Sequence, residues 1–388
     1  MVTNVPSRCV PYWNKYEEAS TTREKISALE ELIACIPKHK GTEKLLKDLK
    51  MKLAKLRAEL SKEISSKPKS RHVFSVSKKG DAQIVLLGTP YSGKTSMINY
   101  LCGSNYLTGS PTQRPQEGIF KWEGCEFQIV DLPPISSADI DSIPNGRAIM
   151  GVAYNSDIIG LVVDATQDVE WQVRTLISAL QESNIILRDP PPIRVKRTRR
   201  GGIVVIGQDF SPFDMNELRE LLKTYRIVNC VIEFYGKVSE YDLYLALNPR
   251  TVYKKGVLLV TKMDLVDDKI GVLKDTKRIL SEFRHELPIV PFSIYCDKCR
   301  HVLGGTIFRE LDLIRVWTKK DGVVHRERAI VLRRPATIKD VCEKIHSEFV
   351  SKFRYAVIER KHDKIRRRIV GLDYPLEDGD IVTIQIRD

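Results

Sequence analysis

The sequence predicts an α/β protein that is built around a doubly wound sheet. We expect a helical hairpin before the sheet domain, an inserted α+β domain within it and a C-terminal β-grasp domain after it. Apolar runs typical of buried parallel strands recur at residues 84–87, 157–163, 257–260 and 289–292, with helical patterns between them. The first run leads into the stretch Gly88-Thr-Pro-Tyr-Ser-Gly-Lys-Thr95, and a helical pattern follows. Strand, glycine loop and helix in this order predict a site for phosphate groups rather than a plain turn.

Length and composition bound the class of protein. The 388 residues are enough for two to four domains, and 42% hydrophobic with 29% charged residues is typical of a soluble globular chain. No apolar run has the length of a membrane span and no signal peptide opens the chain, so we expect a cytoplasmic protein with no membrane partner. The net charge of +13 favours a polyanionic partner such as RNA, although a generally basic, solvated surface would give the same charge.

Eight cysteines are scattered along the chain, and one pair alone has the spacing of metal ligands. This pair is Cys296-Asp-Lys-Cys299, with His301 nearby. A structural zinc site needs four ligands and the chain has no second C-x-x-C pair, so a disulfide or two inert thiols are the better interpretations. The sequence does not decide between these two.

Residues 1–72 are expected to form a helical region and a linker. Residues 1–20 have no clear period, and we expect them to be poorly ordered. Apolar residues at helical spacing then predict two helices, at about 21–36 and 45–60, joined by a short turn. The leucine stripe of the second helix is short, which favours packing against the main domain over a coiled-coil partner. Residues 61–72, rich in serine and lysine, are the predicted linker.

The glycine-rich loop carries the chemistry that a nucleotide phosphate needs. We expect its backbone N–H groups and the helix N-terminus to surround the β-phosphate, Lys94 to reach the β- and γ-phosphates, and the Thr95 hydroxyl to ligate Mg²⁺. Asp131, at the end of the apolar strand 127–130, is expected to hold the same ion rather than to serve only as a turn or capping residue. The other expected contacts in the loop are Gly88, Pro90, Tyr91, Ser92, Gly93 and Ser96.

Two further strand ends carry candidate contacts for the base of a nucleotide. The strand at 257–260 leads into Thr261-Lys-Met-Asp264. A carboxylate at Asp264 accepts from the N1–H and N2–H₂ groups of guanine, which adenine lacks, through charge-assisted bonds of about 1.5–3 kcal/mol each. The stem of Lys262 can lie along the purine face. The full set at the two strand ends is Thr261, Lys262, Asp264, Ser293 and Ile294.

Two segments outside the sheet concentrate positive charge. Within an insertion at about 168–250, a basic strand at 194–200 precedes a Gly-Gly pair and an apolar strand, so we expect a protruding basic ribbon that contacts phosphate backbones. A solvated edge protected by charge is the alternative. Residues 312–388 have the element order of a β-grasp fold. They gather a second basic cluster, which we also expect to contact RNA phosphates. Its members are Arg360, Lys361, Lys364, Arg366, Arg367 and Arg368.

These segments, in this order, resemble the developmentally regulated GTP-binding protein family, a branch of the Obg-related GTPases. The resemblance covers most of the chain and implies a P-loop GTPase domain at 73–167 and 251–311, an inserted domain at 168–250 and a TGS domain at 312–388. It also implies binding of GTP and GDP with Mg²⁺, GTP hydrolysis, a role around ribosomes and rRNA, and Thr112 as the switch I threonine on the metal. The segments that carry it include Lys79-Gly-Asp-Ala82, Gly146-Arg147, Asp164-Ala-Thr166, Gly201-Gly202 and Leu376-Glu-Asp-Gly-Asp380.

Three residues depart from the nucleotide motifs of the family. Pro134 replaces the glycine whose N–H touches the γ-phosphate, and proline has no N–H to donate. Thr261 replaces an asparagine, and Tyr91 occupies a position linked to potassium assistance, which leaves the use of K⁺ open. The chain lacks a Ras-type glutamine, since Ile135 follows Pro134, so we assign no catalytic residue. We expect slow intrinsic hydrolysis that a regulatory partner protein accelerates, unless the Ile135 N–H replaces the missing donor.

Two other functions fit the same motifs. One is a non-catalytic RNA- or ribosome-binding protein in which the nucleotide is structural. The other is an ATPase like the Obg-like relatives that carry a TGS domain, against which Asp264 argues. The ribosomal site, the partner protein and the oligomeric state do not follow from the sequence.

Overall fold

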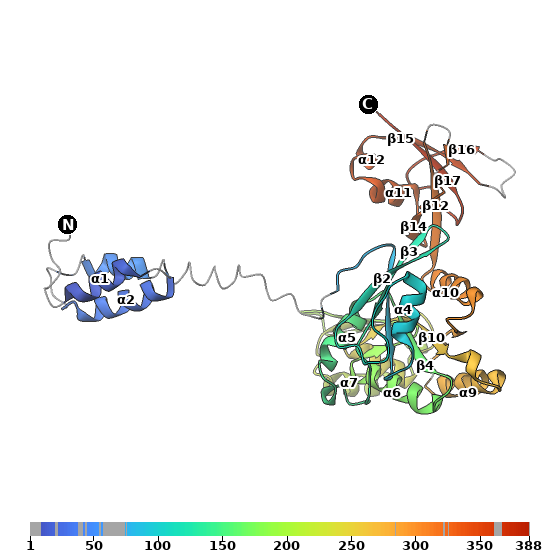
Figure 1. The fold of residues 1–388 in the computed structure, drawn as a ribbon, viewed down its shortest axis with the longest axis horizontal. Helices are drawn as coiled ribbons and strands as arrows, with labels where there is room; N and C mark the ends of the chain where they lie inside the picture. Colours follow the sequence, from blue (N-terminus) through green and yellow to red (C-terminus); the bar gives the residue numbers. More distant parts are fainter. Residues whose placement is uncertain are drawn as a thin grey trace. The chain divides into compact units, whose positions relative to one another are not determined.

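A computed structural model describes residues 9–19, 22–37, 42, 45–53, 56, 74, 76–283, 285–320, 323–324, 326–360 and 367–387. The chain divides into two compact units, Met1–Ser75 and Val76–Asp388 (Figure 1). The predicted linker at 61–72 lies outside the described residues. Within the described part of the chain, no helix has the length and apolar composition that crossing a membrane requires.

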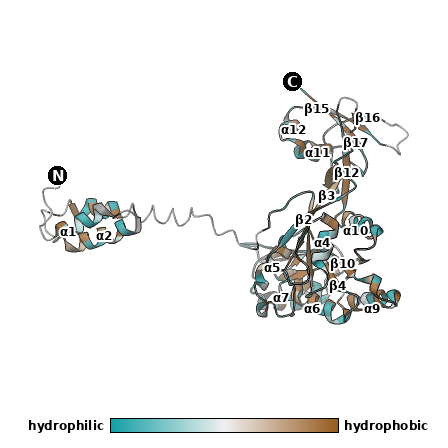
Figure 2. Cartoon of the chain, in the orientation of Figure 1, coloured by the Kyte–Doolittle hydropathy of each residue, from teal (hydrophilic) through white to brown (hydrophobic). Residues whose placement is uncertain are grey.

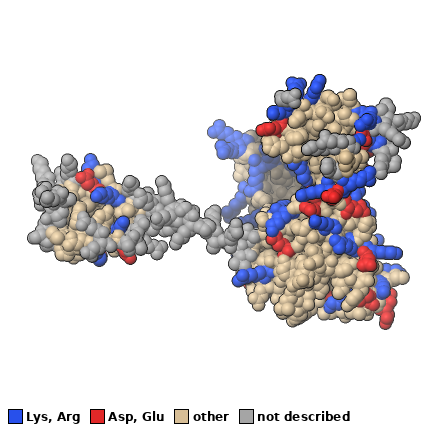
Figure 3. Space-filling model, turned by 45° about the horizontal axis from the view of Figure 1, so that its top comes forward, with Lys and Arg blue, Asp and Glu red and all other residues tan. Residues whose placement is uncertain are grey.

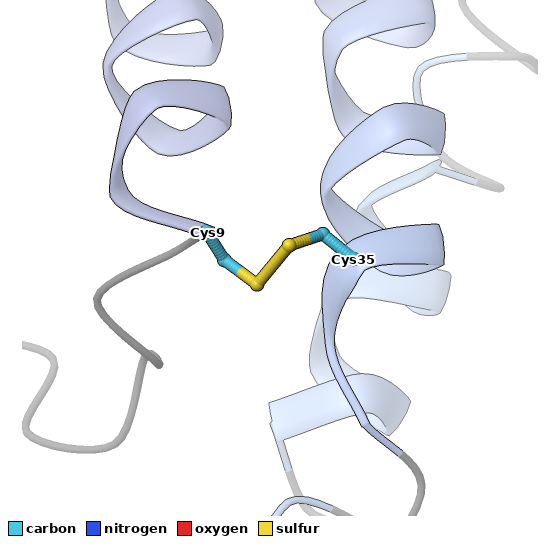
Figure 4. Close-up of a disulfide and its surroundings, with 2 residues drawn as sticks. All are labelled: Cys9 and Cys35. Atoms are coloured by element: carbon cyan, nitrogen blue, oxygen red, sulfur yellow. A yellow bond between two sulfur atoms is a disulfide. The ribbon is translucent and has the colours of Figure 1, made fainter.

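The N-terminal unit is a small helical body with its own core. Helix α1 spans Val10–Glu18, helix α2 spans Thr22–Cys35, and residues 45–53 are helical as well. A disulfide joins Cys9 to Cys35, whose Cα atoms are 5.8 Å apart (Figure 4). The buried residues of this core are Cys9, Leu29, Leu32, Ile36, Leu46 and Leu49.

One expectation for this unit was wrong in part. The segment that we expected to be poorly ordered contains helix α1, because Trp13 and Tyr16 pack against the same core, while residues 1–8 lie outside the described residues. The leucine stripe of the third helical segment contributes Leu46 and Leu49 to that core. The disulfide was not predicted, since two cysteines separated by 26 residues carry no local signal that they meet.

The larger unit is built on a six-stranded sheet in the order β11-β10-β4-β1-β3-β2, which is the predicted doubly wound fold. All neighbouring strands pair in parallel except β2 and β3. The central strands β1 and β4 are buried at every position, as strands covered on both faces must be. The strands are β1 (Ala82–Gly88), β2 (Gln116–Trp122), β3 (Cys125–Asp131), β4 (Ile158–Asp164), β10 (Lys255–Thr261) and β11 (Ile289–Pro291).

Helices cover both faces of this sheet. On one face, α4 (Lys94–Cys102) and α10 (Asp297–Glu310) share a core with β1, β3, β4 and β10. On the other, α6 (Val169–Glu182) packs against β4, β1 and α9 (Lys269–Glu282). Helix α5 (Gly146–Asn155) follows the short helix η2 (Ile140–Ser142). Figure 2 shows the sheet strands as largely hydrophobic and the helices as mixed, which is typical of amphipathic covering helices. The carboxyl ends of the parallel strands therefore meet at one edge, where ligand loops gather.

The inserted domain has a sheet and a core of its own. Strand β5 (Ile185–Ile186) pairs in parallel with β9 (Val252–Tyr253), and the chain between them forms a sheet in the order β6-β8-β7. Helix α6 lies within 168–250 but packs on the main sheet, so we propose that the inserted domain begins after β5. Its elements are β6 (Ile193–Arg197), β7 (Ile203–Ile206), η3 (Gln208–Phe210), α7 (Met215–Thr224), β8 (Cys230–Phe234) and α8 (Glu240–Leu247).

The predicted two-stranded basic ribbon is wrong in its pairing. Strand β6 pairs antiparallel with β8 and strand β7 pairs parallel with β8, so β8 lies between them. Its alternate residues Cys230, Ile232 and Phe234 are buried against helices α7 and α8. That burial favours a central position for β8, and a local pattern around the Gly-Gly pair could not predict it.

The C-terminal segment forms the predicted β-grasp domain. Its strand order is β13-β12-β17-β15-β16, with β14 also paired to β12, and β12 runs parallel to β17. Helix α11 (Ile338–Ile345) begins at a capping box of Thr337 and Asp340 and packs Ile338, Val341 and Cys342 into the domain core. The remaining elements are β12 (Leu313–Lys320), β13 (Val323–Val324), β14 (Ile330–Arg333), α12 (Glu348–Ser351), β15 (Phe353–Glu359), β16 (Arg367–Val370) and β17 (Ile381–Ile386).

Candidate functional site

The phosphate loop joins β1 to α4, and residues with positive φ shape its backbone. Gly93 adopts φ 90° and Tyr91 adopts φ 60°, a left-handed conformation that is uncommon for tyrosine. Gly88 leaves no room for a side chain, because a Cβ there would lie 2.5 Å from the Val162 carbonyl oxygen. The loop keeps its backbone close to β4 in this way, and it lines a cavity of about 240 Å³.

Lys94 is buried at the first position of α4, with its amine against the loop backbone. Its Nζ donates to the carbonyl oxygens of Gly88 and Thr89 at 3.1 and 3.0 Å. Burial lowers the pKa of Lys94 to about 8, while the charge of Asp131 acts in the opposite direction. A buried ammonium group is stabilised by an adjacent anion, and the phosphates of a nucleotide would supply one.

Three residues predicted to ligate a metal come together beside Lys94 from separate segments. Thr95 Oγ1 donates to Asp131 Oδ2 at 2.7 Å, and Thr112 Oγ1 donates to the same oxygen at 3.2 Å. The two hydroxyl oxygens are themselves 3.2 Å apart. Hydroxyl and carboxylate oxygens are the kind of ligand that Mg²⁺ takes from proteins and phosphates.

Asp131 also has an acceptor that the described residues leave unused. Its Oδ1 is buried and receives no hydrogen bond from any of them. Burial raises the pKa of Asp131, and Lys94 and the Thr95 and Thr112 hydroxyls oppose this rise. A divalent cation would satisfy that oxygen and stabilise the charged form, so the residues fit Mg²⁺. The described residues include no group of three His, Cys, Asp or Glu side chains suited to a metal, so a cation bound here would need hydroxyls and nucleotide phosphates as its further ligands.

Residues 132–135, directly after strand β3, offer the phosphate cavity no free backbone donor. The Leu132 N–H donates back to strand β1 at 3.4 Å, and the Ile135 N–H donates to the Gly88 carbonyl at 3.0 Å. Pro133 and Pro134 have no N–H. Pro134 lines the cavity, whereas Ile135 is fully buried. In this structure the Ile135 N–H is therefore engaged with β1 and does not replace the missing glycine donor.

A second cavity, of about 260 Å³, adjoins the phosphate cavity and shares Gly93, Ser96 and Lys262 with it. Asp264 provides a carboxylate at its wall, and Phe292 provides an apolar surface. A polar cavity beside a partly apolar one matches the order of phosphates and base in a nucleotide. The remaining lining residues are Thr261, Leu265, Ser293, Ile294 and Tyr295.

The T-K-x-D segment is held in place by side-chain contacts, although Thr261 replaces the asparagine of the family motif. The Thr261 hydroxyl lies 2.7 Å from the Ser92 carbonyl oxygen and 3.0 Å from that of Val163, so it links strand β10 to the phosphate loop. Lys262 Nζ donates to the buried carboxylate of Asp164, which lays the lysine stem along both cavities. Asp264 is exposed, and among the described residues none donates a hydrogen bond to its carboxylate. Its carboxylate is therefore available to a base.

Several residues around the cavities were not identified from sequence. The buried Gln172 accepts from the Thr89 hydroxyl and from the Asp164 N–H through Oε1, which ties the phosphate loop to the end of β4. Its position on an amphipathic helix carried no signal of this role. The segment before Thr112 did carry one, because it directly precedes a predicted ligand. The missed lining residues are Thr108, Gly109, Ser110, Pro111, Leu265, Phe292 and Tyr295.

The basic segment of the inserted domain leaves its charged side chains exposed. On β6 and the loop after it, Arg197, Arg199 and Arg200 are exposed, as are Arg194 and Lys196. Figure 3 shows lysine and arginine side chains spread over the visible face, with acidic side chains among them.

One member of the C-terminal basic cluster, Arg360, is paired within its own domain. Arg360 donates to both oxygens of Asp380 at 2.8 Å and to Glu377, because the domain uses the guanidinium to hold its last turn. Arg367 pairs with Glu359. Three further members of the cluster lie outside the described residues: Lys361, Lys364 and Arg366.

The fold and the two adjoining cavities define a class: a P-loop GTP-binding protein with a C-terminal TGS domain. A model of the 50S ribosome-binding GTPase family matches residues 83–191, and a TGS domain model matches residues 314–386. A GTP-binding protein of Methanocaldococcus jannaschii, named as uncharacterised, is 32% identical over 374 residues, which are 94% of this chain and 93% of that protein. The chain belongs to the developmentally regulated GTP-binding protein family.

Two further relatives have more specific names. The developmentally-regulated GTP-binding protein 2 homolog of Dictyostelium discoideum is 29% identical, with coverage of 93% of this chain and 98% of its own. Ribosome-interacting GTPase 1 of Saccharomyces cerevisiae is also 29% identical, with coverage of 94% and 99%. The family therefore establishes a GTP-binding protein of the GTPase type, with the guanine nucleotide as its ligand.

Proposed function

We propose that this protein binds GTP and GDP with Mg²⁺ and hydrolyses GTP slowly unless a partner accelerates the reaction. One observation carries the slow rate: no described residue that lines the phosphate cavity has a carboxylate, imidazole or amide side chain. The described wall consists of Gly, Ser, Thr, Pro, Tyr and Lys residues. A side chain that orients the attacking water or takes its proton is absent from that wall, and such a group has to come from elsewhere.

The backbone after strand β3 supports the same conclusion. Pro134 has no N–H, and the Ile135 N–H is bonded to the Gly88 carbonyl. A hydrogen bond from an N–H to an anionic oxygen contributes about 1.5–3 kcal/mol, so GTP loses one contact that would distinguish it from GDP. A ligand shifts a conformational equilibrium only by its difference in affinity for the two states. We therefore propose a reduced conformational contrast between the GTP and GDP forms.

The residues that remain are suited to binding. Lys94 would contact the β- and γ-phosphates, and Thr95, Thr112 and Asp131 would hold Mg²⁺; the hydrogen bonds that bring these three residues together support this assignment. A bound Mg²⁺ would neutralise charge on the phosphate oxygens. Asp264 would select guanine over adenine through two donors on the guanine base. Tyr91, at the position that the family resemblance links to potassium assistance, lines the phosphate cavity and has an exposed side chain.

We further propose that the protein acts in the cytoplasm at ribosomes and contacts rRNA. The name of the yeast relative and the description of the matching family model support this proposal. So do the exposed cations of strand β6 and the loop after it, since Lys and Arg side chains that neutralise phosphates dominate RNA affinity. The C-terminal cluster is a second candidate surface, in which Arg360 already pairs with Asp380.

The test is single-turnover hydrolysis of GTP with and without ribosomes. We expect a slow rate alone and a faster rate with ribosomes or with a ribosome-bound partner. The competing function, a non-catalytic ribosome-binding protein with a structural nucleotide, predicts no turnover under either condition. The cavity wall also fits this second function, so turnover is the measurement that separates the two.

The RNA contact is tested by reversing charge on the inserted domain. Changing Arg197, Arg199 and Arg200 to Glu should reduce co-sedimentation with ribosomes and flatten its salt dependence. The matched control changes three exposed lysines of α9 to Glu, which alters net charge equally at another place. The control residues are Lys269, Lys274 and Lys277. Equal losses in both variants would mean that net charge alone, and not this segment, governs binding.

A further inference from the structure

The sequence Cys296-Asp-Lys-Cys299 lies at the start of helix α10, beside the loop that lines the base cavity. Cys296 is the N-cap residue of this 14-residue helix, and Cys299 follows one turn later. The Cys296 N–H donates to the Ser293 carbonyl at 3.2 Å, and Ser293 itself lines the base cavity. The Cys296 carbonyl accepts from the Tyr100 hydroxyl at 3.3 Å, and Tyr100 belongs to the helix that follows the phosphate loop. The backbone of Cys296 therefore connects both parts of the nucleotide site.

The two thiols are free and partly accessible, and they lie one helical turn apart, because the Cys299 N–H donates to the Cys296 carbonyl oxygen at 3.0 Å. Interaction with the neighbouring Cys299 thiol lowers the pKa of Cys296, the backbone N–H groups of Cys299 and Lys298 lower it further, and burial opposes them. Burial raises the pKa of the Cys299 thiol to about 11. A C-x-x-C pair at a helix N-terminus, with an activated first thiol and a protonated second one, is the arrangement found in disulfide-exchange sites.

We propose that Cys296 and Cys299 form a reversible disulfide and that its closure weakens guanine-nucleotide binding through the 293–296 turn. The first half stands on the thiol pair alone, and the second half rests on the proposed base cavity. A metal is the weaker occupant, because the described residues hold no third His, Cys, Asp or Glu that would complete a ligand group here.

The chemistry is a thiol–disulfide exchange with a small disulfide such as glutathione disulfide as the oxidant. The Cys296 thiolate attacks one sulfur of the oxidant, which forms a mixed disulfide and releases one glutathione thiolate. The Cys299 thiol then loses its proton to solvent, and its sulfur attacks the Cys296 sulfur. The second glutathione leaves, so two protein thiols are oxidised to one disulfide while one glutathione disulfide is reduced to two thiols.

Closure should move Cys296 more than Cys299. Cys299 packs against the main hydrophobic core, whereas Cys296 continues directly into the loop of the base cavity. A disulfide bond brings the two sulfurs to about 2.05 Å, which is much shorter than a hydrogen-bonded contact between thiols. The turn at Ser293 moves with Cys296, because the Cys296 N–H is bonded to the Ser293 carbonyl. This movement removes one well-placed contact to the base, which lowers the affinity for guanine nucleotide about two- to tenfold. By linkage, bound GDP must favour the dithiol by the same factor.

The first experiment equilibrates the full-length protein in glutathione buffers of increasing oxidant content, followed by acid quenching, alkylation and peptide mass spectrometry. We expect the peptide that contains both cysteines to change from doubly alkylated to internally bridged. The variant Cys299→Ser should instead accumulate glutathione on Cys296, and Cys296→Ser should stay unmodified at residue 299. Full alkylation at every oxidant level, or glutathione on both cysteines without closure, would overturn the site. Mapping by peptide keeps the Cys9–Cys35 bond out of the measurement.

The second experiment compares GDP and ADP affinity for the reduced and oxidised protein by calorimetry. We expect GDP to bind about two- to tenfold more weakly after oxidation. The double variant Cys296→Ser, Cys299→Ser should bind GDP equally with and without oxidant, which assigns the effect to this pair and not to another cysteine. Equal GDP affinity in both redox forms of the native protein would overturn the coupling alone. A reduced protein that does not prefer GDP over ADP would overturn the proposed base cavity as well, while the peptide map still decides the disulfide.

Discussion

Replacement of Pro134 by glycine most directly tests the proposal that a missing backbone N–H limits the phosphate cavity. Pro134 lines this cavity and lacks the N–H that would face the γ-phosphate. Glycine at this position restores a backbone donor and adds no side chain. Because a hydrogen bond to an anionic oxygen contributes about 1.5–3 kcal/mol, the variant should gain roughly ten- to a hundredfold in the ratio of GTP-analogue affinity to GDP affinity.

The added flexibility of glycine does not account for such a gain. Replacing proline by glycine costs about 0.4–1 kcal/mol of folding free energy through the unfolded chain, and this cost is shared by both nucleotide states. The neighbouring Pro133 supplies the matched control, since it is buried and does not line the cavity. Pro133→Gly should leave the affinity ratio unchanged while it loosens the same segment.

The assay combines calorimetry with a non-hydrolysable GTP analogue and GDP, and single-turnover hydrolysis of GTP. We expect Pro134→Gly to raise the affinity ratio and the hydrolysis rate together. If Pro134→Gly matches the native protein in both measurements, or if Pro133→Gly gives the same change, then the missing N–H does not limit this site. The hydrogen bond from the Ile135 N–H to Gly88 would in that case have to rearrange on nucleotide binding.

Three further changes test the rest of the site. The pKa of Lys94 is lowered to about 8 in the folded protein, so the unfolded chain binds more protons than the folded chain between about pH 8 and 10.5. The free energy of unfolding of the nucleotide-free protein should therefore rise by up to about 3 kcal/mol over that range. Urea unfolding of Lys94→Met should lack this rise. Asp264→Ala should weaken GDP binding tenfold or more in calorimetry and leave ADP binding unchanged, and equal losses for both nucleotides would contradict its role as the guanine contact. Thr261→Val leaves the buried Ser92 carbonyl without its donor and should cost about 1–3 kcal/mol in thermal unfolding, whereas Thr261→Ser should retain most of that stability.

Much of the fold and part of the site followed from the sequence because they depend on local patterns. The buried strands are recognisable in the sequence as apolar runs, and strand β1 leads into a glycine loop whose backbone only a few residue types allow. Lys94 and Thr95 are tied to that loop by sequence spacing, so their placement beside the cavity needed no tertiary information. Asp131 and Asp264 were predicted on the same basis, since Asp131 ends strand β3 and Asp264 follows the end of strand β10.

Other features depend on which distant segments meet, and no local pattern contains that information. Thr112 reaches Asp131 across 19 residues of sequence, and Lys262 reaches Asp164 across 98. The insertion of β8 between β6 and β7 is decided by burial of one strand face, and the pairing of Arg360 with Asp380 is decided by the fold of the C-terminal domain. Local backbone and periodicity constraints thus determined the sheet, the phosphate loop and the strand-end ligands. Tertiary packing alone decided which charges are left free and which backbone donors are already engaged, because both depend on partners that the chain brings together only when it folds.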